Sequence, residues 1–473
     1  MAKTARKRRT EPSLRRIELK NLWSIYSEKD TKSVFAFAED YKKFISSCKT
    51  ERESYVYFSE MSKKSGWEFF GKAGKGTKKV LIGNRDRALA VVYLGKKGIE
   101  NGFRLVGAHI DAPRLDLKQK PFFEDSNIAL MKTHYYGGIK KYQWVSRPLA
   151  IHGIAVLENG KKVKIEMGED DNDPVFVIPD LLPHLAKNVQ YTKTLPDIIT
   201  GEQLNVIAGQ KEVRNEKSKA KLVEFLLGLL NKKYGIKEED FVSADLEIVP
   251  ADKARDAGFD RTFVGAYGQD DRICGYTAWK AVEGLKEQPD YTSIAFLIDK
   301  EEIGSDGPTG AQSSWLLDII VKLLAFTGRK NDFAQINDVL SRSEAISADV
   351  NAAVNPMFKE VHEINNAAIS GYGVVLTKFT GSGGKYSTNE ATAEFTARIR
   401  GIFNKARVHW QFAELGKIDE GGGGTIAKYL SKWGMNTIDC GPGLLGMHSP
   451  YEVVSKADLW ETFRAYRAFF ENK

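Results

Sequence analysis

Three short segments place histidine or acidic side chains directly after apolar runs, where they could bind metal ions. In the first, Leu105 to Pro113, a predicted strand ends in His109 and Asp111. Strand alternation points both side chains the same way, so the carboxylate can hydrogen-bond the imidazole and fix its tautomer for metal binding. An ordinary strand-end pair is the alternative interpretation of this motif.

The second segment carries the adjacent acids Asp270 and Asp271 at the start of a predicted helix. Two cations held about 3.5–4 Å apart need a shared anionic ligand, and an aspartate can offer one oxygen to each. The alternative is a helix N-terminus, where the helix dipole favours acidic residues.

The third segment is the apolar strand Ile294 to Ile298, which is followed by Glu301 and Glu302. Paired glutamates at the end of a buried strand can divide two tasks: one binds a metal, and the other takes a proton from the attacking water. A surface acidic turn explains poorly why the pair follows a buried strand.

Asp349, after a predicted helix, and His448, before the closing helix, complete an inventory of histidine and carboxylate groups. These ligands suit two divalent metal ions, zinc first, with cobalt or manganese as alternatives. Thiolate chemistry is not indicated, because the three cysteines lie far apart and match no CxxC spacing: Cys48, Cys274 and Cys440.

The elements that must position these residues alternate between strands and helices. Apolar periodicity predicts helices and short strands in the following order: helices 33–48 and 51–67, strands 80–82, 88–94 and 104–109, helix 273–284, strand 293–299, and helices 313–327 and 332–341. This alternation predicts an α/β fold in which helices cover both faces of a sheet.

The middle of the chain has a different pattern. Strand-like runs at 149–157 and 162–167 precede one long helix at 219–233. Because the candidate catalytic residues lie on both sides of this region, we expect a mostly β domain, residues 121–264, inserted into a catalytic domain made of residues 1–120 and 265–473.

Composition narrows the classes of protein. The formal net charge is +8, but Lys3, Arg6, Lys7, Arg8 and Arg9 carry five of these charges. Residues 1–15 are therefore expected to be a disordered basic arm, and no nucleic-acid partner is predicted. No stretch reaches the roughly 18 apolar residues of a membrane span, and no signal-peptide apolar region follows the arm. We expect a cytoplasmic protein without a membrane contact.

Taken in order, these motifs resemble those of the aspartyl aminopeptidase and vacuolar aminopeptidase I family of metallopeptidases. The matching set is His109-x-Asp111, Asp270-Asp271, Asp299-x-Glu301-Glu302-x-Gly304-Ser305, Asp349 and Met447-His448-Ser449. The resemblance implies a three-layer αβα catalytic domain of the zinc-exopeptidase type and an inserted dimerisation domain. One departure is Asp271, where the family usually has asparagine.

The resemblance also implies roles for the metal-site residues. Asp270 would bridge the two metals. In such enzymes the bridging acid often precedes a cis peptide bond. His109 and Glu302 would be terminal ligands of opposite metals, and Asp349 and His448 would complete the set. Asp111 would orient His109, while Glu301 would be the general base that removes a proton from water.

Further matches concern substrate and assembly. The segment Val177 to Leu185 resembles one whose histidine, here His184, crosses a dimer interface to contact substrate. Lys385, Tyr386 and Gly424 match substrate-pocket segments. The resemblance implies peptide substrates cut after the N-terminal residue, with acidic residues as one expected preference. It also implies a homo-oligomer, built from dimers into dodecamers.

Two other functions fit the residues less well. A deacylase or carboxypeptidase could use a similar dinuclear core, and activity on N-blocked substrates would favour it. A non-catalytic, assembled binding protein is the other alternative, although the presence of Glu301 and five ligands argues against it.

Overall fold

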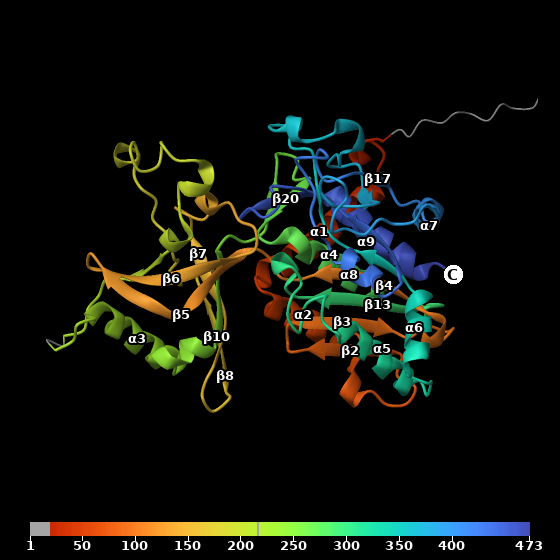
Figure 1. Cartoon of the computed structure of the whole chain (residues 1–473), viewed down its shortest axis with the longest axis horizontal. Helices are drawn as coiled ribbons and strands as arrows, with labels where there is room; N and C mark the ends of the chain where they lie inside the picture. The colour runs from red at the N-terminus through yellow and green to blue at the C-terminus, as the bar shows by residue number, and fades with distance from the viewer. Residues whose placement is uncertain (1–18, 215–216) are drawn as a thin grey trace, which may run out of the picture.

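The computed structural model describes residues 19–214 and 217–473. The expected basic arm, residues 1–15, lies outside the described residues. Figure 1 shows two lobes, a larger body that contains both the beginning and the end of the described chain and a smaller lobe built from its middle. The helices are α1 (Glu28–Ser47), α2 (Glu51–Lys64), α3 (Lys221–Tyr234), α4 (Gln269–Glu283), α5 (Trp315–Phe326), α6 (Phe333–Ser341), α7 (Ala393–Lys405), α8 (Ala427–Ser431) and α9 (Lys456–Glu471).

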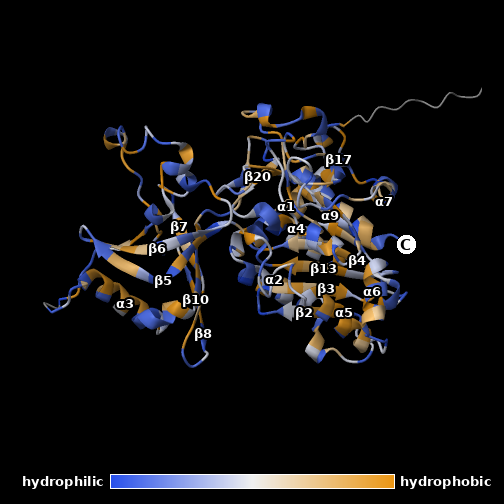
Figure 2. Ribbon diagram, viewed as in Figure 1, coloured by the Kyte–Doolittle hydropathy of each residue, from blue (hydrophilic) through white to orange (hydrophobic). Residues whose placement is uncertain are grey.

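A nine-stranded mixed sheet forms the centre of the body. In spatial order its strands are β1 (Glu68–Phe69), β2 (Lys79–Asn84), β3 (Ala88–Tyr93), β13 (Thr292–Ile298), β4 (Phe103–His109), β14 (Glu344–Ser347), β18 (Asn436–Gly441), β16 (Val374–Thr377) and β17 (Trp410–Phe412). The central strands β3 and β13 are hydrophobic along much of their length (Figure 2), as expected for strands buried on both faces.

Helices cover both faces of this sheet, so the predicted three-layer αβα architecture is confirmed. On one face, buried side chains of α1, α2, α4, α7 and α9 form one hydrophobic cluster with the sheet. On the other face, α5, α6 and α8 pack in a second cluster. Both N-terminal helices begin at caps encoded in the sequence: Ser27 and Asp30 form a capping box at α1, and Thr50 and Glu53 form one at α2. The cap at Ser27 starts α1 five residues before the expected start at residue 33.

The smaller lobe holds a six-stranded sheet. Its strands, in spatial order, are β8 (Lys162–Met167), β7 (Leu149–Val156), β10 (Ala244–Pro250), β5 (Arg114–Asp125), β6 (Ile128–Tyr136) and β9 (Val206–Gly209). This mostly β lobe, called the insert below, packs its own hydrophobic cluster beneath α3. Its role in dimerisation stays a prediction.

The strand pairing sets the limits of the insert sheet. It begins at Arg114, seven residues before the expected start of the inserted region, because the polar run after Leu117 hides a strand. It ends at Pro250, before residue 264. The next strands instead belong to a small sheet of the body: β11 (Arg255–Ala257), β12 (Phe263–Ala266), β20 (Glu452–Ser455), β19 (Gly443–Leu445) and β15 (Asn351–Ala352).

Membrane-spanning character is not found in the described part of the chain, where every helix is too short or too polar to cross a bilayer.

Candidate metal centre

Parallel strands bring the predicted motifs to one edge of the body sheet. Strands β13, β4 and β14 run parallel, and Ile298 pairs with His109 in register. His109 therefore ends β4 where Glu301 and Glu302 follow β13, and Asp349 follows β14 on the other side. The carboxyl ends of parallel strands are where α/β sheets commonly bind ligands.

Asp270, at the start of α4, lies between the two histidines. One carboxylate oxygen is 3.2 Å from Nε2 of His109, and the other is 3.1 Å from Nε2 of His448. The peptide bond between Asp270 and Asp271 is cis. An aspartate with one oxygen directed to each of two histidines has the arrangement required of a bridging ligand.

The remaining acids divide between the two histidines. Oε2 of Glu302 lies 3.5 Å from Nε2 of His448, and Oδ1 of Asp349 lies 4.0 Å from Nε2 of His109. Two overlapping groups have potential ligand atoms within 4.8 Å of one another: His109, Asp270 and Glu302, and His109, Asp271 and Asp349. His109 thus belongs to both groups, and Asp271 joins the site although no role was predicted for it.

Unsatisfied carboxylates make this cluster suited to cations. Buried oxygens of Asp270, Asp271 and Glu302 have no hydrogen-bond partner among the described residues. Burial raises the pKa of Glu301 to about 7, with the nearby charges of Asp111 and Asp270 adding to the effect. Burial also raises the pKa of Glu302 and of Asp349 well above the usual carboxyl range. A bound cation would pair with the unsatisfied oxygens and would stabilise the ionised form of these buried carboxylates. Imidazole and carboxylate groups together are a donor set that zinc accepts.

Asp111 lies behind His109 and connects several parts of the site. Its carboxylate is 3.3 Å from Nδ1 of His109, and it accepts the hydroxyl of Tyr136 at 2.8 Å. It also accepts the backbone N–H groups of Glu301 and Glu302. Burial opposes the charged form, but the hydrogen bonds to His109 and Tyr136 keep the pKa of Asp111 below its ordinary value.

Glu452 on β20 is a buried residue that the sequence motifs did not reveal. One of its oxygens accepts the backbone N–H groups of Gln269 and Asp270, and the other accepts the backbone N–H of His448 at 2.8 Å. A single carboxylate therefore ties together two segments that are 178 residues apart in the sequence and carry candidate ligands.

The insert also contributes to the site through the end of β6. Nδ1 of His448 lies 2.9 Å from the carbonyl oxygen of Gly138, so an N–H at Nδ1 can donate there and leave Nε2 free for a metal. A Cβ atom on Gly138 would lie 3.3 Å from that Nδ1, tighter than an ordinary contact. Glycine lets this segment approach the histidine.

A cavity of about 580 Å³ opens onto the cluster. Its lining includes His109, Asp270, Glu301, Glu302, Asp349, His448, Lys428 and the predicted Gly424. Lys385 and Tyr386 do not line it: Lys385 pairs with Glu390 at 2.9 Å, and the side chain of Tyr386 is 77% exposed. Ser387, the next residue, does line it. His184 lies on the surface of the insert, in a short 3-10 helix (Pro183–Leu185), and is not part of this lining.

Comparison with known proteins identifies the family to which the chain belongs. The model of one family, described as "Aminopeptidase I zinc metalloprotease (M18)", matches residues 41–470. The chain belongs to the M18 family. It is 47% identical over 461 residues to the "Probable M18 family aminopeptidase 1" of Clostridium acetobutylicum, covering 96% of this M18 chain and 98% of that protein. It is 27% identical over 433 residues to the "Aspartyl aminopeptidase" of Caenorhabditis elegans, covering 88% of each.

Solved structures agree with this M18 assignment. The crystal structure of the M18 aminopeptidase from Thermotoga maritima has a TM-score of 0.92 at 45% identity, covering 97% of this chain and 100% of that one. The crystal structure of prApe1 has a TM-score of 0.80 at 25% identity, covering 96% and 97%. This M18 chain is a zinc metallo-aminopeptidase, which removes N-terminal residues from peptides. The comparisons do not support the alternatives considered from the sequence, which were a deacylase, a carboxypeptidase and a non-catalytic binding protein.

Proposed function

We propose that the chain binds two divalent metal ions and uses them to hydrolyse the first peptide bond of peptides with a free N-terminus. Asp270 carries this proposal, because its two carboxylate oxygens face His109 and His448 separately. Asp349 would complete the ligands of the ion bound by His109 and Asp270. Glu302 would complete those of the ion bound by His448 and Asp270. Zinc is the proposed metal, in line with the family, and cobalt and manganese are the alternatives to be tested.

Metal ions held by these residues would lower the pKa of the attacking water and polarise the scissile carbonyl. Glu301 lines the cavity without a hydrogen bond from its side chain to another described side chain, so its carboxylate is available to water. It accepts the proton as water attacks the carbonyl carbon, and then delivers that proton to the departing amine. Asp111 holds the backbone of Glu301 and the ring of His109 during both steps.

The free α-amine explains why cleavage would stop after one residue. The acidic side chains that line the cavity are Asp270, Glu301, Glu302 and Asp349. The negative charge of this cluster would attract an ammonium group, and an acetylated N-terminus loses that interaction. The family includes an aspartyl aminopeptidase, so acidic N-terminal residues are the first preference to examine.

A substrate panel tests the proposed function directly. Aminoacyl p-nitroanilides with free and acetylated N-termini would be assayed with zinc, cobalt and manganese, and metal content would be counted on the same samples. We expect two ions per subunit and turnover only of the free-amine substrates. Equal turnover of acetylated substrates, or full activity with one ion, would contradict the proposal.

We also propose that the insert forms a dimer and that dimers build a larger closed homo-oligomer. One structural neighbour is described as the mApe1 dodecamer of yeast. In this chain, exposed apolar side chains gather on one stretch of the insert, including Leu182, Leu185 and Tyr191, at 48%, 63% and 69% exposure. Apolar side chains exposed together commonly mark protein interfaces. His184 lies within this stretch and is proposed to reach substrate in the partner subunit.

Light scattering on charge-introducing variants tests the interface. Leu185→Glu and Tyr191→Glu should release monomers, whereas Phe333→Glu, at an exposed apolar position of the body, should leave dimers intact. His184→Ala should lower turnover in dimers that still assemble. A fully active monomer would contradict both the interface and the role given to His184.

The compartment is a further proposal. All three cysteines are buried and free, and none is in a disulfide. This state supports a reducing, cytoplasmic location.

A further inference from the structure

The insert contains a second cavity, separate from the metal centre. It has a volume of about 610 Å³ and lies between α3 and the six-stranded sheet. Its lining shares no residue with the cavity at the metal centre. The volume falls within the roughly 300–1,000 Å³ typical of small-molecule sites.

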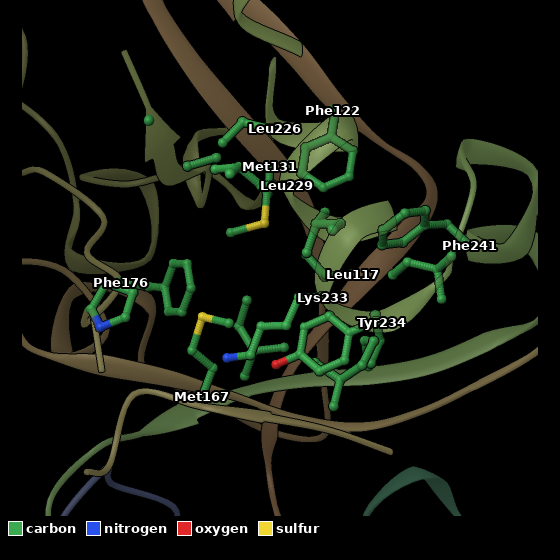
Figure 3. Close-up of a pocket in the computed structure, with 18 of the residues that line it drawn as sticks. Leu117, Phe122, Met131, Met167, Phe176, Leu226, Leu229, Lys233, Tyr234 and Phe241 are labelled. Carbon is green, nitrogen blue, oxygen red and sulfur yellow. The ribbon is translucent and has the colours of Figure 1, made fainter. Parts of the chain in front are cut away.

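The walls of this cavity are almost entirely hydrocarbon. Figure 3 shows Phe122, Met131, Leu226 and Leu229 around an open space, with Met167 and Phe176 on its other side. These side chains come from β5, β6 and β8, from α3 and from the loop after β8. A peptide occupant would leave its backbone polar groups without partners here, which is costly. An acyl chain has no such groups.

Helix α3 is too apolar for its present burial. Its sequence from Phe225 to Leu230 contains five large apolar residues, yet only Leu222 and Val223 of the helix are fully buried. Leu229 lines the cavity while its side chain is 50% exposed. A hydrocarbon occupant would remove the inner side of this helix from water, which is favourable in proportion to the apolar area covered.

A positive charge stands at one side of the cavity. Lys233 and Tyr234 both line it and lie side by side in Figure 3. The ammonium of Lys233 is 5.1 Å from the centre of the Tyr234 ring, a cation–π distance. Within residues 19–214 and 217–473, no carboxylate pairs with Lys233, and no side chain hydrogen-bonds the Tyr234 hydroxyl. Lys232 adds a second cationic side chain to the lining.

We propose that this cavity binds a long-chain monocarboxylate of the fatty-acid class. The acyl tail occupies the space between α3 and the sheet, and the carboxylate remains at the solvent-facing end beside Lys233 and the Tyr234 hydroxyl. The single anionic head matches the local cations, and the tail matches the walls. This cavity and the cavity at the metal centre have no lining residue in common. We therefore expect the fatty acid to bind whether or not the enzyme is hydrolysing a peptide.

Fluorescence titration of the full-length protein with cis-parinaric acid tests the proposal. Competition by palmitate, against hexadecanol and a hexadecyltrimethylammonium salt below their aggregation limits, separates the contribution of the head from that of the tail. We expect saturable binding of one acid per chain, displaced by palmitate at least about tenfold better than by either control.

Two variants locate the site. Leu229→Trp should fill the cavity and lower affinity at least about tenfold, at a half-exposed position that tolerates a larger side chain. Lys233→Glu should weaken the acid and not the alcohol. Lys221→Glu, at the opposite end of α3 and outside the lining, is the matched control and should bind normally. Aminopeptidase turnover confirms that each variant is folded.

Several results would overturn the inference. They are no saturable binding, binding that Leu229→Trp leaves unchanged, or equal displacement by palmitate and hexadecanol together with an ineffective Lys233→Glu. Binding that appears only after the oligomer is dissociated would also overturn it, because a second copy of the chain would then be the occupant.

Discussion

The backbone N–H of Glu301 donates to a carboxylate oxygen of Asp111 across 3.2 Å. The second oxygen of Asp111 accepts from the backbone of Glu302, while the same carboxylate faces the ring of His109. The buried side chain of Asp111 therefore positions the proposed base, Glu301, and two proposed ligands, His109 and Glu302. It also connects the ends of β4 and β13, which carry these residues.

Asp111→Asn should consequently reduce both metal affinity and turnover. The amide keeps the shape but brings an N–H₂ group toward at least one N–H donor, and it weakens the imidazole as a ligand. Loss of such an outer partner typically costs about 10–100-fold in affinity or activity. Chelator competition and turnover measure the effect, with Asp125→Asn, an exposed carboxylate at the end of β5, as control. Wild-type values for Asp111→Asn would contradict its positioning role.

The adjacent glutamates should separate catalysis from metal binding. Glu301→Gln retains size but cannot accept the proton, so we expect both ions to remain while turnover falls at least about 100-fold. Glu302→Gln should lose occupancy at one site and recover partly with added metal. Metal counting and turnover decide between them. If Glu301→Gln shed metal while Glu302→Gln did not, the two roles would be reversed.

Asp270 should control both ions at once. Asp270→Asn removes the charge shared by the two sites, so we expect occupancy of both to fall together. His109→Gln and His448→Gln should each weaken one ion more than the other. Equilibrium dialysis with zinc gives the stoichiometry of each variant. Two tightly held ions in Asp270→Asn would refute the bridging assignment.

Glu452→Gln tests whether the hidden carboxylate maintains the geometry of the ligands. The amide loses an acceptor for the backbone N–H of His448 or of Asp270, so we expect lower metal affinity, lower melting temperature and lower turnover. The decrease in melting temperature should be larger in the apo protein than in the metal-loaded protein, because bound ions would hold the same segments together. Glu68→Gln, at an exposed position of β1, is the control. An unchanged chelator midpoint would show that Glu452 serves only the fold.

His152 should make stability depend on pH away from the metal centre. Burial disfavours its charge, but hydrogen bonds with Glu169 and Glu53 outweigh this and raise the pKa of His152 to about 9. Because the folded-state pKa is raised, the stabilisation is fully present below about pH 6.5 and is lost as pH rises through about 9. It is on the order of 3 kcal/mol.

Melting curves from pH 6 to pH 10 test this linkage. The stability difference between the wild-type protein and His152→Gln should shrink over that range, whereas His134→Gln, an exposed histidine of the same sheet, should change little. A constant difference would contradict the assignment of a charged His152.

The sequence predicted the edge of the sheet well because its signals are local. His109, Glu301 and Asp349 each follow an apolar run within a few residues, and parallel strands bring such run ends together. Helix α4 was equally readable, because Asp270 and Asp271 stand at its start. The helices on both faces of the body sheet were predicted from the alternation of strands and helices along the sequence, and the resemblance to the family implied the three-layer architecture.

Other parts of the site had no local signal. Glu452 hydrogen-bonds to Gln269 from a short strand 183 residues away, and Tyr136 reaches Asp111 from the insert. The start of β5 was missed because Lys118 and Lys120 interrupt the apolar pattern. The predicted Lys385 and Tyr386 lie outside the cavity, since a β-bridge between Ser382 and Tyr386 folds that segment back on itself. Their contact with substrate stays a prediction.

The end of β6 constrains how such enzymes can be recombined. Tyr136 and the Gly138 carbonyl both reach the metal site from a hairpin of the insert. A chimera that exchanges the insert between relatives would carry these two contacts into a foreign active site, whatever it did to assembly. Junctions placed after Gly138 would keep the native contacts but divide the insert sheet. Modular exchange therefore requires the β5–β6 hairpin and the His448 loop to be transplanted as a pair.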